Sequence, residues 1–188
     1  TVKPHLFGLE EFGVEIVAKN KYYRVTSNPQ QPEYVALYES GDTVTENVVM
    51  AASKAEGKTT IQFASANYMV QDVCLYLRAL GVDIEGVGAQ TITINGKAGD
   101  IKKDVEYAPA EDPIEAMFFI SAALTTDSEI TIKRVPIDFM TLEILKLKKM
   151  GATFSQSARY KADNGNTDLV DITVHKHNGK LWALDDKI

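Results

Sequence analysis

The feature that most constrains this sequence is a segment pattern that occurs three times at a nearly constant spacing. The stretches "HLFGLEEFGVEI", "VCLYLRALGVDI" and "EILKLKKMGATF" each place apolar residues at helical spacing, then a glycine, then an extended apolar pattern. The glycines are Gly13, Gly81 and Gly151, which lie 68 and 70 positions apart. Because glycine readily adopts the left-handed backbone at a helix end, each copy predicts a helix that stops and turns into a strand.

Each full copy is predicted to contain a helix, a strand, a second helix and two further strands. The stretch "TVTENVVMAASKAEGKTTI" parallels "EDPIEAMFFISAAL", and Glu46 and Glu115 lie 69 positions apart. The first copy is cut short, because residues 1–13 supply only its second helix. Alternating patterns and turn residues predict short strands and hairpins. The strands are expected at 59–63 and 130–133, and the hairpins at 15–27, 83–96 and 153–163.

The repeat predicts an α/β (α+β) fold with helices inside and sheets outside. The first helices of the later copies, around 48–52 and 117–123, are apolar on nearly all sides, which is typical of buried helices. Short strands outside such helices give inside-out α/β repeats. A length of 188 residues favours a single domain, 1–188. We expect it to contain a truncated first repeat at 1–40, a second at 41–108 and a third at 109–188.

Charge and composition exclude several classes of partner. The net charge is -6 and the chain has no Lys/Arg-rich run, so we expect no nucleic acid and no anionic membrane. The longest apolar runs are too short to span a bilayer. A single cysteine fits a reducing compartment and predicts a cytoplasmic protein. No glycine loop of the nucleotide-binding kind precedes a helix, and we expect no cofactor.

A polar cluster, "ESGDTVTEN" at 39–47, stands directly before an apolar helical pattern. Thr43 and Glu46 have the spacing of a capping box, which explains the cluster without a ligand. A helix start also presents free N–H groups that can receive an anion, a carboxylate or a polar sugar face. The acidic Glu39 and Asp42 disfavour phosphate and suit hydroxyl or amide groups better. Both interpretations remain open at this point.

Other candidate residues have simpler structural explanations. Cys74 lies within an apolar helical pattern and is expected to be a buried, inert thiol rather than a nucleophile. His175 and His177 would share one face of a strand and could bind a metal, but solvent-exposed edge residues are the favoured interpretation. Asn67 is expected to cap a helix, with a ligand contact as the alternative. In the third copy, Asp112 is expected to cap the helix that begins at Pro113.

Three stretches together resemble a known enzyme family. "TENVVMAASKAEGKTTI", "LRALGVDIEGVGAQTITINGK" and "DPIEAMFFISAAL" are similar to UDP-N-acetylglucosamine 1-carboxyvinyltransferases, the enolpyruvyl transferases of peptidoglycan synthesis. The resemblance implies a fold of two domains, each built from three repeats, of which this chain would form most of one. It also implies transfer of the enolpyruvyl group of phosphoenolpyruvate to the 3'-hydroxyl of UDP-N-acetylglucosamine, in a cleft shared with the second domain of the same chain.

The resemblance also implies which residues contact the substrate. The family's mobile catalytic loop precedes a Pro-Val-Asp-Leu-His pattern that corresponds to residues 1–5, so it would lie before Thr1 and leave this fragment without catalytic residues and inactive alone. Family members usually read Ser-Val-Gly or Ser-Val-Thr before the helix, where this chain has Gly41-Asp42-Thr43. The family aspartate of the Pro-Val-Asp-Leu pattern corresponds to Lys3. The implied substrate-binding residues are Lys3, Pro4, Glu39, Ser40, Gly41, Asp42 and Thr43.

Two alternative functions remain beside this one. A 3-phosphoshikimate 1-carboxyvinyltransferase would share the fold and the chemistry. A non-catalytic binding module could keep the repeat fold without the reaction. No metal is expected in any of these cases.

Overall fold

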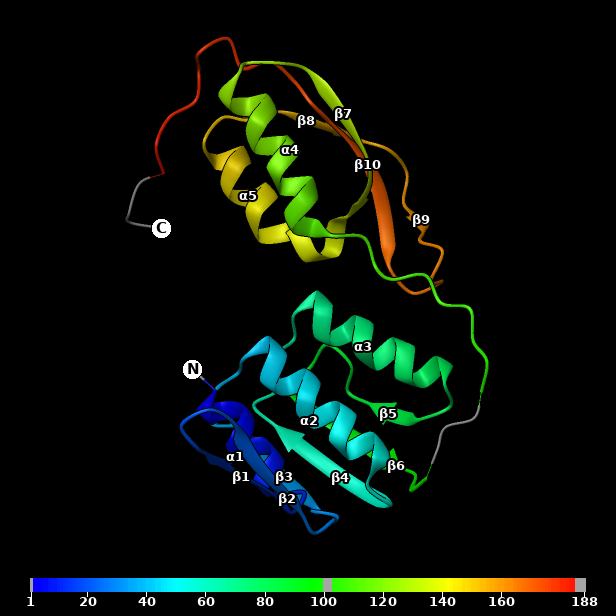
Figure 1. Cartoon of the computed structure of the whole chain (residues 1–188). Coiled ribbons are helices and arrows are strands. Elements are labelled where there is room, and N and C mark those ends of the chain that lie inside the picture. Colours follow the sequence, from blue (N-terminus) through cyan, green and yellow to red (C-terminus); the bar gives the residue numbers. More distant parts are fainter. Residues whose placement is uncertain (1, 100–102, 185–188) are drawn as a thin grey trace. The chain divides into compact units, whose positions relative to one another are not determined.

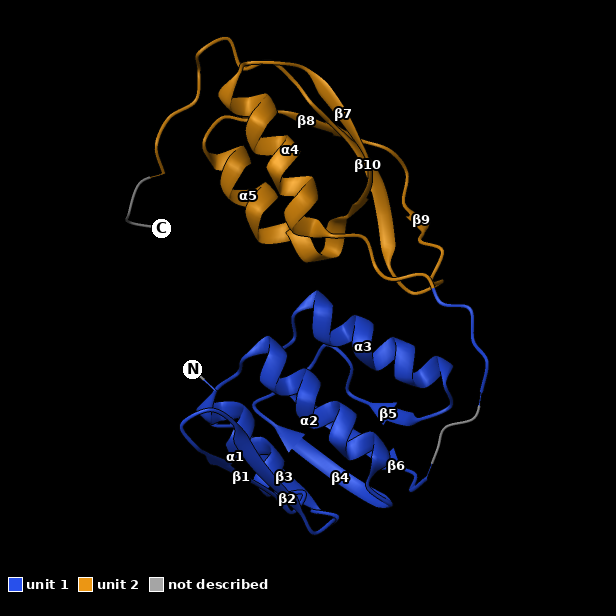
Figure 2. Cartoon of the chain, in the orientation of Figure 1, with its two compact units in different colours: residues 1–107 blue, residues 108–188 orange. Residues whose placement is uncertain are grey.

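The computed structural model describes residues 2–99 and 103–184. The chain divides into two compact units, residues 1–107 (unit 1) and residues 108–188 (unit 2), as Figure 2 shows. The division falls one residue before the predicted border between the second and third repeats. The organisation of 1–188 as a single domain stays a prediction. The expected catalytic loop before Thr1 lies outside the described residues.

Among its described residues, unit 1 contains one hairpin and one four-stranded sheet. The hairpin pairs β1 with β2, and the sheet has the order β3-β4-β6-β5, with β3 parallel to β4 and the other pairs antiparallel. The helices α2 and α3 lie on one face of this sheet (Figure 1). The elements are α1 (Lys3–Glu10), β1 (Val14–Ala18), β2 (Tyr23–Ser27), β3 (Tyr34–Ala36), α2 (Asp42–Lys54), β4 (Gly57–Gln62), α3 (Tyr68–Ala79), β5 (Asp83–Glu85) and β6 (Thr91–Gly96).

Unit 2 is built around a central strand, β10. The antiparallel sheet has the order β7-β10-β8, and β9 also pairs with β10. The helices α4 and α5 lie side by side on one face of this sheet (Figure 1). The elements are α4 (Pro113–Thr125), β7 (Ile130–Pro136), the 3-10 helix η1 (Ile137–Met140), α5 (Thr141–Lys149), β8 (Phe154–Gln156), β9 (Tyr160–Lys161) and β10 (Asp168–Val174).

The three repeat glycines adopt the predicted left-handed backbone. Their φ angles are 78° at Gly13, 98° at Gly81 and 98° at Gly151. The first two predicted hairpins are confirmed, because β1 pairs with β2 and β5 pairs with β6. The first turns over Asn20-Lys21, where Lys19 N donates to Tyr22 O at 2.8 Å. The expected short strands are confirmed as β4 and β7.

The third predicted hairpin, at 153–163, is wrong. β8 and β9 each pair with β10 rather than with one another. The reason is that β10 is a long strand that buries apolar side chains at alternate positions, Val170, Ile172 and Val174, and both short strands can bond to it.

Each unit has its own apolar core, but the helices are not buried all round. Val48 and Val49 of α2 are fully buried, as expected, whereas Met50 is 45% exposed. On α4, Ile120 is fully buried, while Phe118 is 67% and Phe119 is 40% exposed. The prediction that this helix is buried on nearly all sides is therefore wrong within unit 2, because the sheet covers only one of its faces. Among the described residues, no helix combines the length and apolarity needed to cross a bilayer.

Candidate functional site

Side chains near the starts of α1 and α2 lie close together in unit 1. His5 of α1 lies beside Asn47 of α2, with Nδ1 2.7 Å from the Asn47 amide nitrogen, and its Nε2 lies 3.5 Å from Thr43 Oγ1. Since an amide nitrogen can only donate, Nδ1 accepts, and a neutral ring then carries its proton on Nε2, facing Thr43. His5 therefore links the two helix starts.

A close approach of the two helices makes this arrangement possible. A Cβ atom placed on Gly8 of α1 would lie 2.5 Å from Val48 Cγ2 of α2. Real side chains do not approach so closely, so the absence of a side chain at Gly8 sets how near α1 can come. Pro4 is buried, whereas Lys3 and Glu39 are exposed.

The helix start of α2 differs in detail from the predicted capping box. The N-cap is Gly41, with an extended backbone, and Thr43 already lies inside the helix. The Gly41 carbonyl accepts bonds from Thr45 N at 3.1 Å and from Thr45 Oγ1 at 2.7 Å. The capping box of Thr43 and Glu46 is therefore wrong. The physical reason is that Gly41 can adopt the extended N-cap backbone without a capping side chain. The helix therefore starts two residues before the predicted cap, Thr43.

Asp42 connects the start of α2 to the start of α3. Its Oδ1 accepts a bond from Ser65 Oγ at 2.5 Å and its Oδ2 accepts one from Asn67 Nδ2 at 2.7 Å. Ser65 Oγ in turn accepts from Asn67 N at 3.1 Å. Asn67 does occupy the N-cap position of α3, but its side chain bonds to Asp42 instead of the helix backbone, so the predicted cap contact is wrong.

These contacts hold the residues before α2 in place. Thr45 Oγ1 accepts a bond from Ser65 N at 3.0 Å, and Ser40 Oγ donates to Ala64 O at 3.2 Å. The loop after β4 is thus bonded to both sides of the α2 start. We name the resulting group the Asp42 network; its members are Asp42, Thr45, Ser65 and Asn67. Ser65 was noted in the sequence only as a polar residue before a helix, and its bond to Asp42 depends on the tertiary structure.

The surroundings of Glu46 change the pKa of its side chain. Partial burial raises the pKa of Glu46 above its usual value, and the negative charge of Asp42, four positions earlier on the same helix, raises it further. A raised pKa in the folded state means that folding favours the protonated acid. The folded protein therefore loses stability as the pH rises from the unfolded pKa through the folded pKa.

The substitution Glu46→Gln is expected to stabilise the protein at pH 7. The gain is about 0.5 kcal/mol or less, since the side chain is partly solvated and its repulsion from Asp42 is screened. The gain should disappear at pH 4, where the glutamate of the native protein is protonated. Urea unfolding at both pH values measures the difference, and a variant that is less stable than the native protein at pH 7 would contradict it.

The other candidates occupy structural positions. Cys74 is fully buried, as predicted, and burial raises the pKa of its thiol to about 11, which favours an inert cysteine over a nucleophile. Asp112 caps α4 by accepting from Ile114 N at 2.7 Å, as predicted. His175 and His177 follow the end of β10 rather than lying within it. Across residues 2–99 and 103–184, no three His, Cys, Asp or Glu side chains are placed to hold a metal ion.

The two histidines bond to different groups. His175 Nδ1 lies 3.0 Å from Glu129 Oε2 and its Nε2 lies 2.6 Å from Ser155 Oγ. His177 Nε2 lies 2.8 Å from Leu124 O. These contacts connect strand ends to neighbouring segments, so the expectation that both side chains are simply solvated is wrong for His177, which is largely covered.

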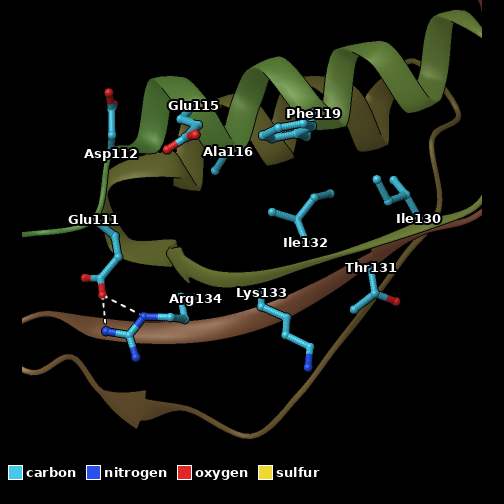
Figure 3. A pocket seen from close by; sticks show the side chains of 10 residues that line it. All are labelled: Glu111, Asp112, Glu115, Ala116, Phe119, Ile130, Thr131, Ile132, Lys133 and Arg134. Carbon is cyan, nitrogen blue, oxygen red and sulfur yellow. Dashed lines mark hydrogen bonds and ion pairs between the residues drawn. The ribbon is translucent and has the colours of Figure 1, made fainter.

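Unit 2 contains a separate cavity of about 460 Å³ between α4 and β7 (Figure 3). At one end, Arg134 bonds to Glu111 Oε1 through Nε at 3.0 Å and also through a terminal nitrogen. The bond to Glu111 raises the pKa of Arg134 above its ordinary value. Sequence reasoning missed this pair, because Glu111 and Arg134 lie 23 positions apart and only the fold brings them together. Arg134 has a left-handed backbone, with φ 59°.

The sequence and the fold of this chain are similar to those of known proteins. The sequence profile of EPSP synthase (3-phosphoshikimate 1-carboxyvinyltransferase) matches residues 2–183. The chain therefore belongs to this family of carboxyvinyltransferases. Curated relatives bear the more specific name UDP-N-acetylglucosamine 1-carboxyvinyltransferase. One from Myxococcus xanthus is 33% identical over 181 residues and 95% of this chain, and one from Campylobacter hominis is 35% identical over 150 residues and 80% of it.

The match covers only part of each relative. It spans 42% of the Myxococcus xanthus protein and 36% of the Campylobacter hominis protein, so the chain has about two fifths of the length of the former. The enolpyruvyl transferase NikO from Streptomyces tendae has a similar fold, with a TM-score of 0.74 at 22% identity over 93% of this chain and 42% of that one. EPSP synthase from Acinetobacter baumannii gives 0.69 at 21% identity over 92% and 39%. The predicted α/β fold and the family resemblance are confirmed.

Proposed function

We propose that this chain forms part of a transferase that moves the enolpyruvyl group of phosphoenolpyruvate to the 3'-hydroxyl of UDP-N-acetylglucosamine. The reaction would be a cytoplasmic step in the synthesis of peptidoglycan precursors. The proposal rests on the start of α2, which the hydrogen bonds of the Asp42 network hold in place. It also rests on the 33% identity to a curated UDP-N-acetylglucosamine 1-carboxyvinyltransferase.

The chemistry is an addition followed by an elimination. A base takes the proton of the sugar 3'-hydroxyl as its oxygen forms a bond to C2 of phosphoenolpyruvate, and an acid adds a proton to C3 as the C2–C3 double bond becomes single, which gives a tetrahedral intermediate. Loss of a proton from C3 then breaks the bond between C2 and the phosphate oxygen, and inorganic phosphate leaves. General acid and base groups and cationic side chains are needed for these steps. We assign them to parts of the enzyme beyond the residues of this chain.

The chain itself would bind the acceptor. The proposed binding residues are Lys3, Pro4 and Glu39 to Thr43, and the start of α2 presents N–H groups that can bind a polar ligand. The Asp42 carboxylate is held by two bonds with its charge beside the helix start. A fixed carboxylate accepts bonds from hydroxyl and amide donors and repels phosphate, which favours the uridine and sugar part of the acceptor.

A 3-phosphoshikimate acceptor is the second candidate, and the name of the matching family supports it. That acceptor carries a phosphate on a small ring. The negative charge of Asp42 at the α2 start weighs against it, as do the names of the curated relatives.

A chimera tests the proposal. The matched segment of the Myxococcus xanthus relative is replaced by the corresponding segment of this chain, and release of phosphate from phosphoenolpyruvate is measured with each acceptor. We expect release that depends on UDP-N-acetylglucosamine and none with shikimate 3-phosphate. The isolated 188-residue chain, used as control, should release no phosphate.

Circular dichroism and thermal unfolding establish that the chimera is folded. A folded chimera that responds only to shikimate 3-phosphate would replace the proposed acceptor with the second candidate. A folded chimera that is inactive with both acceptors would overturn the assignment to catalysis and favour a non-catalytic module.

A further inference from the structure

The sheet of unit 2 has a polar face on the side opposite to α4 and α5. On β10, Ile172 and Val174 are fully buried in the core, so the alternate residues Thr173 and His175 lie on the other face. Ser155 of β8 is the pairing partner of Thr173, and partners on neighbouring strands share a face. Ser155 and His175 therefore lie on the same polar face.

The strand ladders place an acidic residue on the other side of His175. Although His175 follows the last residue of β10, its backbone N–H still donates to Thr153 O at 3.1 Å, so the ladder with β8 continues past the strand end. On the β7 side, Val174 pairs with Ile130, which directly follows Glu129. The histidine thus lies between a serine of β8 and the glutamate that precedes β7.

The hydrogen bonds of His175 have a defined direction. Its Nδ1 lies 3.0 Å from Glu129 Oε2, and its Nε2 lies 2.6 Å from Ser155 Oγ. An ionised carboxylate can only accept, so Nδ1 carries the proton of a neutral ring and Nε2 accepts from the serine hydroxyl. We name these three residues the Ser155 triad. A base that accepts the proton of a serine and is oriented by a carboxylate is the arrangement that makes a serine nucleophilic.

Stability alone does not account for this arrangement. The side chain of His175 is 37% exposed and that of Glu129 is 59% exposed, and exposed ion pairs contribute little to stability. His177 differs, because its side chain is only 11% exposed and its Nε2 lies 2.8 Å from Leu124 O. His177 therefore has a structural role, whereas the Ser155 hydroxyl beside His175 is exposed and open to a reagent from solvent.

A pair of threonine hydroxyls lies beside Ser155. Thr173 Oγ1 is 2.8 Å from Thr131 Oγ1 across the ladder of β7 and β10, and both residues share the face of Ser155. Only one of the two hydroxyls donates in this bond, so the other retains a proton for a further bond. A hydroxyl donor next to a nucleophile can stabilise the negative oxygen that develops when an ester carbonyl is attacked. The threonine pair therefore supplies a donor that the Ser155 triad itself does not contain.

We propose that Ser155 is a nucleophile that accepts the acyl group of small activated esters, such as aryl acetates, and passes it to water. Glu129 acts as a positioning residue, because it contacts His175 rather than the ester. Since the side chains of Ser155 and His175 are accessible, the face offers few contacts to hold an ester, and the reaction needs a leaving group that departs easily, as a phenol does. This activity is independent of the proposed enolpyruvyl transfer.

The reaction consists of an acylation and a hydrolysis, and His175 moves the proton in both. Ser155 Oγ forms a bond to the carbonyl carbon while His175 Nε2 takes the hydroxyl proton, which gives a tetrahedral intermediate. The bond from this carbon to the aryl oxygen then breaks, and the phenol leaves with the proton from His175. Water attacks the acyl-serine in the same way, the bond to Ser155 Oγ breaks, and the serine regains a proton as the carboxylic acid leaves.

Treatment of the isolated 188-residue chain with p-nitrophenyl acetate tests the proposal. Mass spectrometry after acid quenching should find Ser155 acetylated at least about tenfold faster than Ser157. Ser157 is a matched control, because it is also exposed but its hydroxyl donates to Ala158 O, at 2.8 Å, rather than to a histidine. Equal rates of acetylation at the two serines would overturn the proposal.

Variants separate the roles of the three residues. His175→Gln should lower acetylation of Ser155 to the level of Ser157, and Ser155→Ala should lower the release of p-nitrophenol. Glu129→Gln retains an oxygen that can accept from Nδ1 but removes the charge, so it should slow acetylation about tenfold without changing thermal unfolding. Lys176→Ala, an exposed neighbour, is the control and should change neither rate. Undiminished acetylation of Ser155 in His175→Gln, or unchanged release in Ser155→Ala, would overturn the proposal.

Discussion

Replacing Gly96 with alanine is expected to lower the free energy of unfolding of unit 1 by about 3 kcal/mol, at the upper end of the usual cost of overpacking. Gly96 ends β6 directly beneath the end of α2. An added Cβ would lie 2.0 Å from Ala52 O and 2.1 Å from Ala55 O. Both contacts are with backbone atoms, so neither can be relieved by rotating a side chain. The helix or the strand must move instead.

Thermal unfolding of the isolated chain, with probes in each unit, measures this effect. Lys97→Ala provides a neighbouring control, because Lys97 is exposed and only its backbone N–H bonds to Ser53 O, at 3.1 Å. The control should change stability by less than about 0.5 kcal/mol. If Gly96→Ala were as mild as Lys97→Ala, the close packing of β6 under α2 would be disproved.

Replacing Asp42 with alanine is expected to weaken both stability and acceptor binding. The carboxylate accepts bonds from Ser65 Oγ and Asn67 Nδ2, and hydrogen bonds to a charged group contribute about 1.5–3 kcal/mol each. Because Asp42 is only partly buried, we expect a combined loss of about 2 kcal/mol in the free energy of unfolding. Loss of the network also frees the loop after β4, which holds the α2 start in place.

In the chimera, the same substitution should raise the KM for UDP-N-acetylglucosamine about tenfold and leave the KM for phosphoenolpyruvate unchanged. Asp83→Ala is the matched control, because Asp83 also accepts a bond from an asparagine amide, Asn95 Nδ2 at 2.7 Å, but is exposed on β5. It should alter neither constant. An unchanged acceptor KM in the Asp42 variant would remove this residue from the proposed site.

Much of the fold could be predicted because its signals are local. The glycines at 13, 81 and 151 marked helix ends that the structure confirms by their φ angles. The turn at Asn20-Lys21 and the cap at Asp112 were also correct, since each depends on residues within one turn of the chain. The capping box at Thr43 was wrong by two residues, because several residues of that cluster are acceptable helix starts on local preference alone.

The candidate site was predicted as a region but not as a set of contacts. The motif before α2 indicated where a site would lie. It could not show that Asp42 bonds to Ser65 and Asn67, or that His5 joins α1 to α2. In unit 2 nothing in the sequence indicated that Glu111 and Arg134 would meet.

The sequence by itself determined the repeat, the helix ends, the turns and the family, because these depend on backbone preferences and on residue spacing along one short segment. Only the tertiary structure decided which strands pair, which faces of α4 are covered and which polar side chains meet. β8 and β9 both pair with β10, and, within the described residues, one edge of β7 is unpaired. The physical reason is that such pairings depend on which distant segments compete for the same backbone groups, and that competition is settled only when the chain is folded.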